Sequence, residues 1–183
     1  MPNAILDPTG RAPAPAATSA AAPRAARRPD LAGARVGLLE NTKQNAALLL
    51  QEVANLLIAE HGAAGVVLMR TKQAFALPAS DELVAEYAAA CDVVVTGVGD
   101  CGSCSASAVA DGVLFEAAGL PAAVICSDAF VATADAMAAL RGAPGYRYVT
   151  TEHPVAVLTP QQVQERAKHV VSGVVVILTE ARS

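Results

Sequence analysis

The sequence lacks tryptophan and is poor in aromatic residues, which make up 3% of its 183 positions. Only 16% of the residues are charged and the net charge is −4, so the basic surface that binds nucleic acid is missing and we expect no nucleic-acid partner. No apolar run reaches about 18 residues, the length that a membrane-spanning helix needs, so we expect no membrane partner. The first residues also lack a basic stretch followed by an apolar one, which predicts a cytoplasmic protein.

Ala, Val and Leu supply most of the hydrophobic residues, which form 54% of the chain. A chain of this length and composition can bury a core and predicts one domain, which we place at residues 33–183. Residues 1–32 differ, because they hold six of the eleven prolines together with alanines and four arginines. We expect this segment to be disordered or to act as a docking arm, with the turn-like residues 5–10 contacting the domain or a neighbouring subunit.

From residue 35 onward, short apolar segments alternate with segments of helical periodicity. The predicted strands cover 35–40, 65–69, 92–96, 122–127 and 146–149, and the predicted helices cover 45–61, 81–90, 105–118, 128–140 and the segment from 160 onward. Residues 170–178 are rich in β-branched side chains and could form a strand, but their continuity with 161–168 favours a helix. The alternation predicts an α/β three-layer sandwich with a mostly parallel five-stranded sheet.

Ligands of parallel sheets bind beyond the carboxyl ends of the strands. The loops that follow the predicted strands contain three cysteines, one histidine, lysines and amides. Two of these side chains have a structural alternative, because Asn41 could cap the next helix and Asp100 could be an ordinary turn residue. The candidate substrate-binding residues are Asn41, Lys43, Asn45, Lys72, Gly99, Asp100, Ser103 and Cys126.

The sequence Cys101-Gly-Ser-Cys104 lies where a loop enters a helix. Backbone N–H groups and the helix dipole stabilise a thiolate at a helix N-terminus and lower its pKa, so Cys101 is the candidate nucleophile. Cys104 could resolve a mixed disulfide three residues further on. His153, in a loop before a proline, is the candidate general acid or base. Cys91 precedes a strand at its opposite end, which indicates a structural residue.

Three other interpretations apply to the same loop. Residues 97–102 match G-x-G-x-x-G, the dinucleotide-binding pattern, although it lies in mid-chain with little sequence after it. Cys101, Cys104, Cys126 and His153 could instead form a metal site, although a single C-x-x-C is weak evidence and we expect no metal. A thioredoxin-like protein also carries C-x-x-C, but the aromatic and proline context is absent here.

The sequence Gly-Val-Gly-Asp-Cys-Gly-Ser-Cys, which ends at Cys104, resembles the signature of the UGSC family of selenoproteins and their cysteine homologues. Residues 5–10, 39–46, 153–154 and 158–160 also resemble that family, so the resemblance covers most of the chain. Where family members often carry Asp and Pro on either side of Asn-Thr-Lys, this chain has Glu40 and Gln44. Neither difference affects the cysteines.

The resemblance implies that Cys101 stands at the position that selenocysteine often occupies in this family, with Cys104 as its partner. Lys43, Asn45 and His153 become site residues by the same resemblance. The motif is also similar to that of the selenoprotein B subunits of glycine, sarcosine, betaine and proline reductases, where a selenolate or thiolate attacks a substrate carbon. A position that accepts either chalcogen implies nucleophilic or redox chemistry.

The resulting hypothesis is a thiol-dependent enzyme of the reductase type. Cys101 attacks a small electrophilic substrate, Cys104 is its redox partner, and no cofactor is needed beyond an external thiol reductant. One alternative is a covalent thiol lyase or transferase of a biosynthetic pathway, without redox cycling. Another is a non-catalytic or metal-binding subunit of a larger assembly. The composition also favours a homo-oligomer or a partner subunit.

Overall fold

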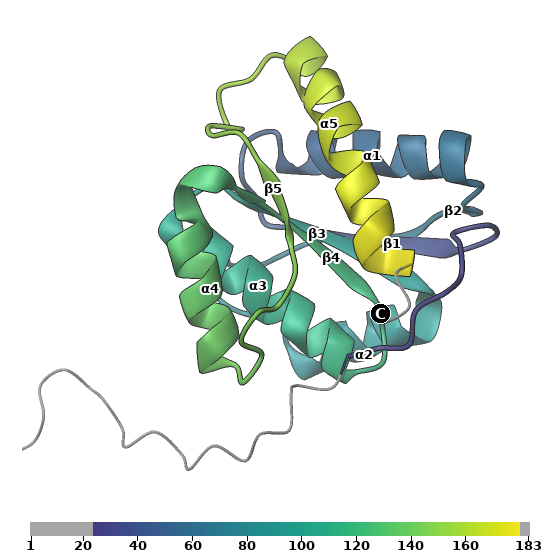
Figure 1. Ribbon diagram of the computed structural model, residues 1–183, viewed down its shortest axis with the longest axis horizontal. Helices are drawn as coiled ribbons and strands as arrows, with labels where there is room; N and C mark the ends of the chain where they lie inside the picture. The colour runs from purple at the N-terminus through teal and green to yellow at the C-terminus, as the bar shows by residue number, and fades with distance from the viewer. Residues whose placement is uncertain (1–23, 180–183) are drawn as a thin grey trace, which may run out of the picture.

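The computed structural model describes residues 24–179, in which parallel strands alternate with helices (Figure 1). The strands are β1 Arg35–Glu40, β2 Gly65–Thr71, β3 Val93–Gly99, β4 Ala122–Ser127 and β5 Val149–Thr151. The α-helices are α1 Ala46–His61, α2 Asp81–Ala90, α3 Gly102–Ala117, α4 Val131–Leu140 and α5 Pro160–Thr179. A short 3₁₀ turn, η1 Asp128–Phe130, precedes α4.

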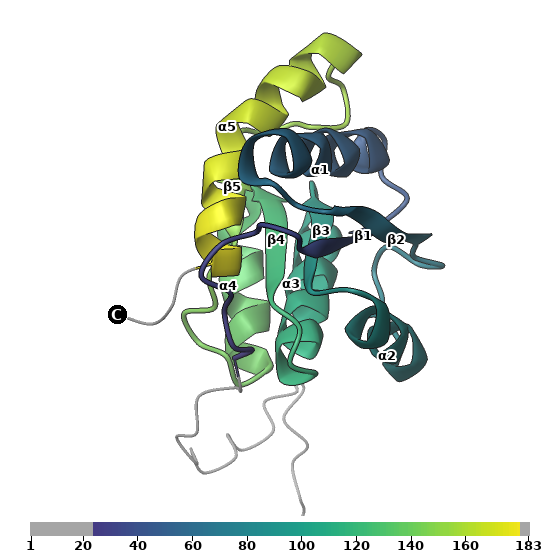
Figure 2. The same ribbon diagram turned by 90° about the vertical axis from the view of Figure 1, so that its right-hand side faces the viewer.

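The five strands form one sheet in the order β2-β1-β3-β4-β5, and every neighbouring pair is parallel. The α1 and α5 helices cover one face, and α2, α3 and α4 cover the other (Figure 2). This arrangement confirms the predicted α/β three-layer fold. The chain changes direction across the sheet between β1 and β3, and in such sheets ligands bind at the carboxyl ends of the strands beside that reversal.

The order of the strands follows from their hydrophobicity. All seven residues of β3 are buried, as expected for a central strand covered by helices on both faces. The edge strand β2 is mostly exposed or half-buried along its length. The largest apolar cluster lies between the sheet and the α1–α5 pair, where Leu49, Leu50 and Val53 of α1 are fully buried. This core fixes the strand ends from which the site is built.

Several elements differ in their bounds from the sequence prediction, and one ambiguous segment is settled. The strand predicted at 92–96 runs to Gly99, the strand predicted at 65–69 runs to Thr71, and the helix predicted at 128–140 starts with the 3₁₀ turn. The last helix is continuous through 170–178, which confirms the helix. The fifth strand was predicted at 146–149 but spans Val149–Thr151, because Tyr146 and Tyr148 direct their hydroxyls to Ala122 and Asp135 while pairing with β4 starts at Val149. The third helix begins at Gly102 rather than at residue 105, because Cys101 caps it.

The predicted N-terminal arm is described only from residue 24. Its Arg27 guanidinium pairs with the Glu116 carboxylate near the end of α3, at 2.5 Å, and donates to the carbonyl of Ile177 at 2.8 Å. The backbone N–H of Ala25 also donates to Glu116, at 2.8 Å. Residues 24–27 are therefore tied to the domain, whereas residues 5–10 lie outside the described part of the chain. None of the described helices combines the length and apolar character needed to cross a membrane.

Candidate functional site

Cys101 is the N-cap residue of α3. Its backbone is extended and its Sγ accepts a hydrogen bond from the Cys104 backbone N–H at 3.3 Å. The Ser103 hydroxyl lies 3.5 Å from the same sulfur. Serine, threonine and aspartate usually fill this position because their oxygens satisfy free N–H groups at a helix start. Here a half-buried sulfur does so, which places a thiol in the positive field of the helix N-terminus.

The two thiols of the motif have opposite ionisation tendencies. Burial by itself raises the pKa of Cys101, but hydrogen bonds from Cys104 and Ser103 and the positive charge of Lys43 outweigh it and lower that pKa. Cys104 is fully buried, and burial together with the neighbouring Cys101 raises its pKa to about 11. Cys101 therefore ionises first, and Cys104 keeps its proton at neutral pH.

Lys43 approaches the thiols from the loop after β1. Its charge lowers the pKa of Cys101, and it also opposes the upward shift of the pKa of Cys104. The Lys43 Nζ lies 4.5 Å from the centre of the Phe75 ring. Lys43 is thus a cation from outside the motif that favours the ionised form of Cys101.

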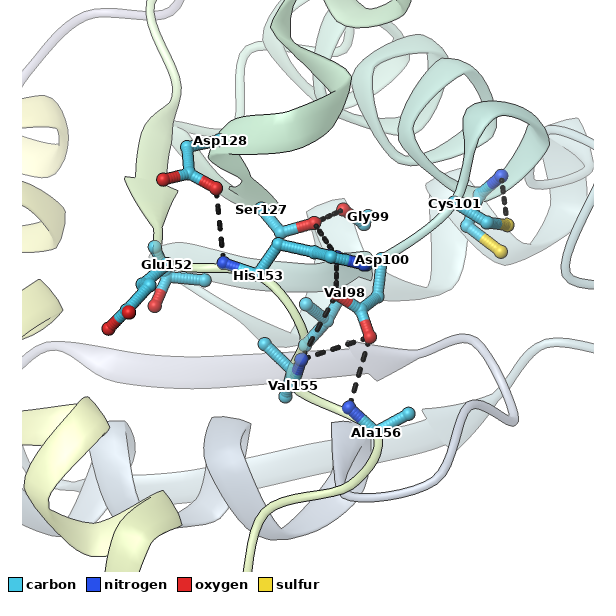
Figure 3. Close-up of polar contacts among 12 residues, drawn as sticks. Val98, Gly99, Asp100, Cys101, Ser127, Asp128, Glu152, His153, Val155 and Ala156 are labelled. Atoms are coloured by element: carbon cyan, nitrogen blue, oxygen red, sulfur yellow. Dashed lines mark hydrogen bonds and ion pairs between the residues drawn. The ribbon is translucent and has the colours of Figure 1, made fainter.

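Asp100, the residue before Cys101, joins two loops at this edge of the sheet (Figure 3). Its buried carboxylate accepts the backbone N–H of Val155 at 3.0 and 3.1 Å and that of Ala156 at 3.0 Å. The same carboxylate lies 3.0 Å from Nδ1 of His153. Asp100 is therefore more than a turn residue, because it fixes the His153 loop to the start of α3.

His153 is held from three directions. Its backbone N–H donates to the Asp128 carboxylate at 3.0 Å, and its Nδ1 faces Asp100 and the Ser127 hydroxyl, the latter at 3.3 Å. The Phe130 ring packs edge-on against the imidazole at 5.3 Å. Because the Ser127 hydroxyl donates to the Gly99 carbonyl, we assign the Nδ1 proton to His153. Nε2 is then the ring nitrogen for proton exchange with a ligand.

The structure brings Cys101 and His153 to the same edge of the sheet but not into contact. Figure 3 shows the imidazole beside Asp100 and the Cys101 side chain away from it, at the start of α3. The peptide bonds Gly97–Val98 and His153–Pro154 at this edge are both cis.

The two predicted asparagines hold backbone rather than present their amides to a ligand. Asn41 donates to the Val98 carbonyl at 2.8 Å and accepts the Val98 N–H at 3.1 Å, so it joins β1 to β3 where the sheet order reverses. Asn45 donates to the carbonyls of Val155 and Leu158 at 3.0 and 2.9 Å. Both residues position the loops that carry Asp100 and His153.

Gly99 and Cys126 form the floor beneath the α3 N-terminus. A Cβ atom on Gly99 would lie 2.6 Å from the Cys126 sulfur and 2.7 Å from the Ser105 hydroxyl, so only glycine fits between β3 and α3. Cys126 is fully buried, and burial raises its pKa to about 12. These two residues shape the site from below and do not face solvent.

Lys72 is buried away from the thiols. Its ammonium lies 2.6 Å from the Asp111 carboxylate and 2.6 Å from the Ser107 hydroxyl, both on α3. The charge of Lys72 is thus compensated inside the protein, and its predicted substrate-binding role gives way to anchoring the loop after β2. Ser103, in contrast, is exposed beside the Cys101 sulfur, where a ligand can reach it.

Four residues of the described site were missed by sequence reasoning: Phe75, Ser127, Asp128 and Phe130. Ser127 ends a predicted strand at the ligand-binding edge and Asp128 follows it directly, so their position was a usable signal. Phe75 lies in a loop without a motif, and no local pattern identifies it. Among residues 24–179, no group of three or more His, Cys, Asp or Glu side chains is arranged to hold a metal ion.

The fold and the site together define a doubly wound α/β protein with a thiol that caps the helix after its central strand. The model of the UGSC family matches residues 4–180, so the chain belongs to that family and the predicted membership is confirmed, whereas the similarity to selenoprotein B subunits stays a prediction. The matched region includes Lys43, Cys101, Cys104 and His153. Searches of the curated proteins and of the solved structures found no match to the chain.

Proposed function

We propose that this protein is a thiol-dependent enzyme in which the Cys101 thiolate attacks a small electrophilic substrate and Cys104 acts as its redox partner. The observation that carries the proposal is the Cys101 sulfur at the N-cap of α3, where it accepts the Cys104 N–H at 3.3 Å. The hydrogen bonds at this position and the charge of Lys43 lower its pKa despite partial burial. A stabilised thiolate at a ligand-binding edge is what nucleophilic catalysis by cysteine requires.

The proposed reaction has two covalent steps. The thiolate displaces a leaving group X from a substrate R–X, so that a sulfur–carbon bond forms and X⁻ departs. The Cys104 thiolate then attacks the Cys101 sulfur, so the disulfide forms and the electron pair of the broken sulfur–carbon bond stays on R. R takes up the proton that Cys104 released and leaves as R–H. An external dithiol reduces the disulfide, and it supplies the two electrons and two protons of the net reaction.

The first step changes the charges that act on the Cys104 thiol. Burial is the main reason for its raised pKa, and the hydrogen bond with Cys101 and the charge of Cys101 raise that pKa further. Once Cys101 is a thioether, its charge is gone, while Lys43 still favours a thiolate at Cys104. Loss of the Cys101 charge therefore removes one of the causes that raise the pKa of Cys104, at the stage when there is an adduct to release.

His153 handles the proton in this proposal. Its Nδ1 is held by the buried Asp100 carboxylate at 3.0 Å, which orients the ring. Nε2 can then give a proton to the leaving group or to R at the exposed edge of the site. Because His153 does not contact Cys101, it acts on the substrate and not as the base that ionises the nucleophile.

A second candidate is a lyase or transferase in which Cys104 never oxidises. The complete burial of Cys104 favours it, since a buried thiol can stabilise the Cys101 thiolate as a hydrogen-bond donor without itself being oxidised. In that case the covalent adduct is released by elimination or by transfer to a second substrate.

Intact-mass spectrometry of the reduced chain during iodoacetamide alkylation tests the proposal. We expect Cys101 to be alkylated first, with a midpoint below the ordinary thiol pKa of about 8.5, and Cys101→Ser to abolish the fast reaction. Cys91→Ser is the matched control, because Cys91 is buried beside β1, where burial raises its pKa to about 11.

Mild oxidation of the same sample separates the two candidates. Loss of two hydrogen atoms, mapped to a Cys101–Cys104 disulfide and absent from Cys104→Ser, supports the redox mechanism. A fast Cys101 without this disulfide supports the lyase or transferase. A Cys101 that reacts no faster than Cys91 contradicts both, and leaves a non-catalytic subunit as the function.

A further inference from the structure

The loop between β2 and α2 lies beside the candidate site but has no part in the chemistry above. It contains Phe75, whose side chain is 41% exposed although it is a large aromatic residue. The ring is not packed into a core cluster, and its notable contact is with the Lys43 ammonium, 4.5 Å from the ring centre. A cation within about 6 Å of an aromatic face is attracted by the negative charge density of the ring.

The loop that carries Phe75 is fastened to α3 at both ends. At its start, the buried Lys72 ammonium binds Ser107 and Asp111, each at 2.6 Å. Towards its end, the Ser107 hydroxyl donates to the Leu77 carbonyl at 2.7 Å, and Asp111 accepts the Ala79 N–H at 2.7 Å.

Ser107 and Asp111 belong to the same helix that Cys101 caps. The four hydrogen bonds therefore fix the Phe75 loop relative to the Cys101 sulfur. An aromatic ring carried on this loop can hold a second group at a defined place beside the thiol.

A lysine near a thiolate does little unless it stays there. The Lys43 side chain is long and only half-buried, so an unrestrained ammonium would move into solvent, where its effect on the thiol is screened. An apolar side chain in place of Phe75 could not hold the ammonium, because it has no negatively charged face. The ring is thus suited to keep the ammonium near the sulfur without neutralising the positive charge. A carboxylate in the same place would neutralise it.

We propose that Phe75 is a positioning residue, which holds the Lys43 ammonium beside the Cys101 thiol by a cation–π contact from a loop anchored to α3. The inference rests on the proposed nucleophilic role of Cys101. It adds that the reactivity of the thiolate depends on an aromatic ring outside the motif.

The rate of Cys101 alkylation as a function of pH tests this inference. Phe75→Leu should reduce the rate at neutral pH by about two- to five-fold, which corresponds to the strength of an exposed cation–π contact, and should move the midpoint upward. The limiting rate at high pH should not change, because the thiol is then fully ionised in both proteins. Phe75→Tyr retains the ring face and should keep the wild-type profile. Leu77→Ala is the matched control on the same loop, since its side chain is 63% exposed.

Combining Phe75→Leu with Lys43→Met tests whether Phe75 acts through the Lys43 ammonium. If the ring works through the ammonium, Phe75→Leu has no further effect in the Lys43→Met background. An equal effect in both backgrounds, or a Phe75→Leu profile identical to the wild type, would overturn the inference. The proposed function fails separately, if wild-type Cys101 has no lowered midpoint at all.

Discussion

A single hydroxyl supports the Cys101 thiolate from the exposed side. The Ser103 Oγ lies 3.5 Å from the sulfur and is among the groups that lower the pKa of Cys101. A lowered pKa means that reactivity persists to lower pH and is lost only as the pH falls through that value. Ser103→Ala should raise the midpoint of Cys101 alkylation and slow the reaction at neutral pH by about three-fold.

The control for this substitution is Ser80→Ala. Ser80 caps α2 and accepts the Leu83 N–H at 3.3 Å, so its loss should reduce stability but leave the Cys101 titration unchanged. If both variants moved the Cys101 midpoint equally, the hydroxyl of Ser103 would have no specific effect on the thiol.

The contacts of Asp100 use both oxygens of its carboxylate. The backbone N–H groups of Val155 and Ala156 donate to it, together with His153. An amide at this position turns an NH₂ group towards at least one of these donors. Asp100→Asn should therefore reduce the free energy of unfolding by about 1–3 kcal/mol, measured by urea denaturation.

Asp128→Asn is the comparison for Asp100→Asn. The exposed Asp128 accepts the His153 backbone N–H, and an amide oxygen can replace the carboxylate oxygen there. A loss of stability in Asp128→Asn as large as that in Asp100→Asn would show that the Val155 and Ala156 contacts contribute little.

The sequence identified the thiols but not the residues that support them. Cys101 could be predicted because a C-x-x-C at a helix start has a local physical reason. The contact between Asp100 and the His153 loop joins residues more than fifty positions apart, and nothing in either segment reveals it. Asn41 and Asn45 were predicted as ligand-binding residues because they follow a strand at the ligand-binding edge. The sequence alone does not show whether such an amide side chain binds backbone or substrate. The side chain of Lys72 was likewise expected to face a substrate, and only tertiary structure pairs it with Asp111.

At the scale of elements, α3 connects the site to the rest of the fold. Its N-terminus carries Cys101, and its middle carries Asp111, whose carboxylate lies 2.6 Å from the buried Lys72 ammonium. Removal of one partner leaves the other charge buried without compensation, which in proteins costs about 3–5 kcal/mol. Lys72→Met should destabilise the protein by that order in urea denaturation.

The double variant Lys72→Met with Asp111→Leu provides the control. It removes both charges and should recover a large part of the stability, because apolar side chains can replace a buried ion pair. A double variant less stable than Lys72→Met alone would show that this pair stabilises the fold beyond neutralising its own charges.

The elements themselves were largely predictable, and the exceptions have physical causes. Strands form at the predicted residues where a short apolar segment is also buried in the fold, as in β1 and β4. The start of α3 was misplaced because cysteine is a rare N-cap residue. The start of β5 was misplaced because Tyr146 and Tyr148 are typical of strands, yet here they pack on α3 and α4 before strand pairing begins.

At the scale of the whole molecule, α3 separates the candidate site from the contact that holds the N-terminal segment. The Cys101 site lies at its N-terminal end, and the Arg27–Glu116 pair lies near its C-terminal end, about 22 Å away at 1.5 Å per residue. Both side chains of this pair are 4% exposed. Arg27→Met should therefore destabilise the fold by about 3–5 kcal/mol without changing the pH midpoint of Cys101 alkylation. A shifted midpoint would show that the N-terminal segment influences the thiol through the helix.

The contact of Arg27 with the Ile177 carbonyl has a practical consequence. It brings residues near the two ends of the described chain together, beside the C-terminal part of α3 and away from the end of the helix that Cys101 caps. A solid support or a fluorescent carrier attached near either end would leave the thiol edge facing the solution. The protein can therefore be immobilised for electrode or surface-binding measurements through the end of the fold opposite to the one that carries the Cys101 sulfur.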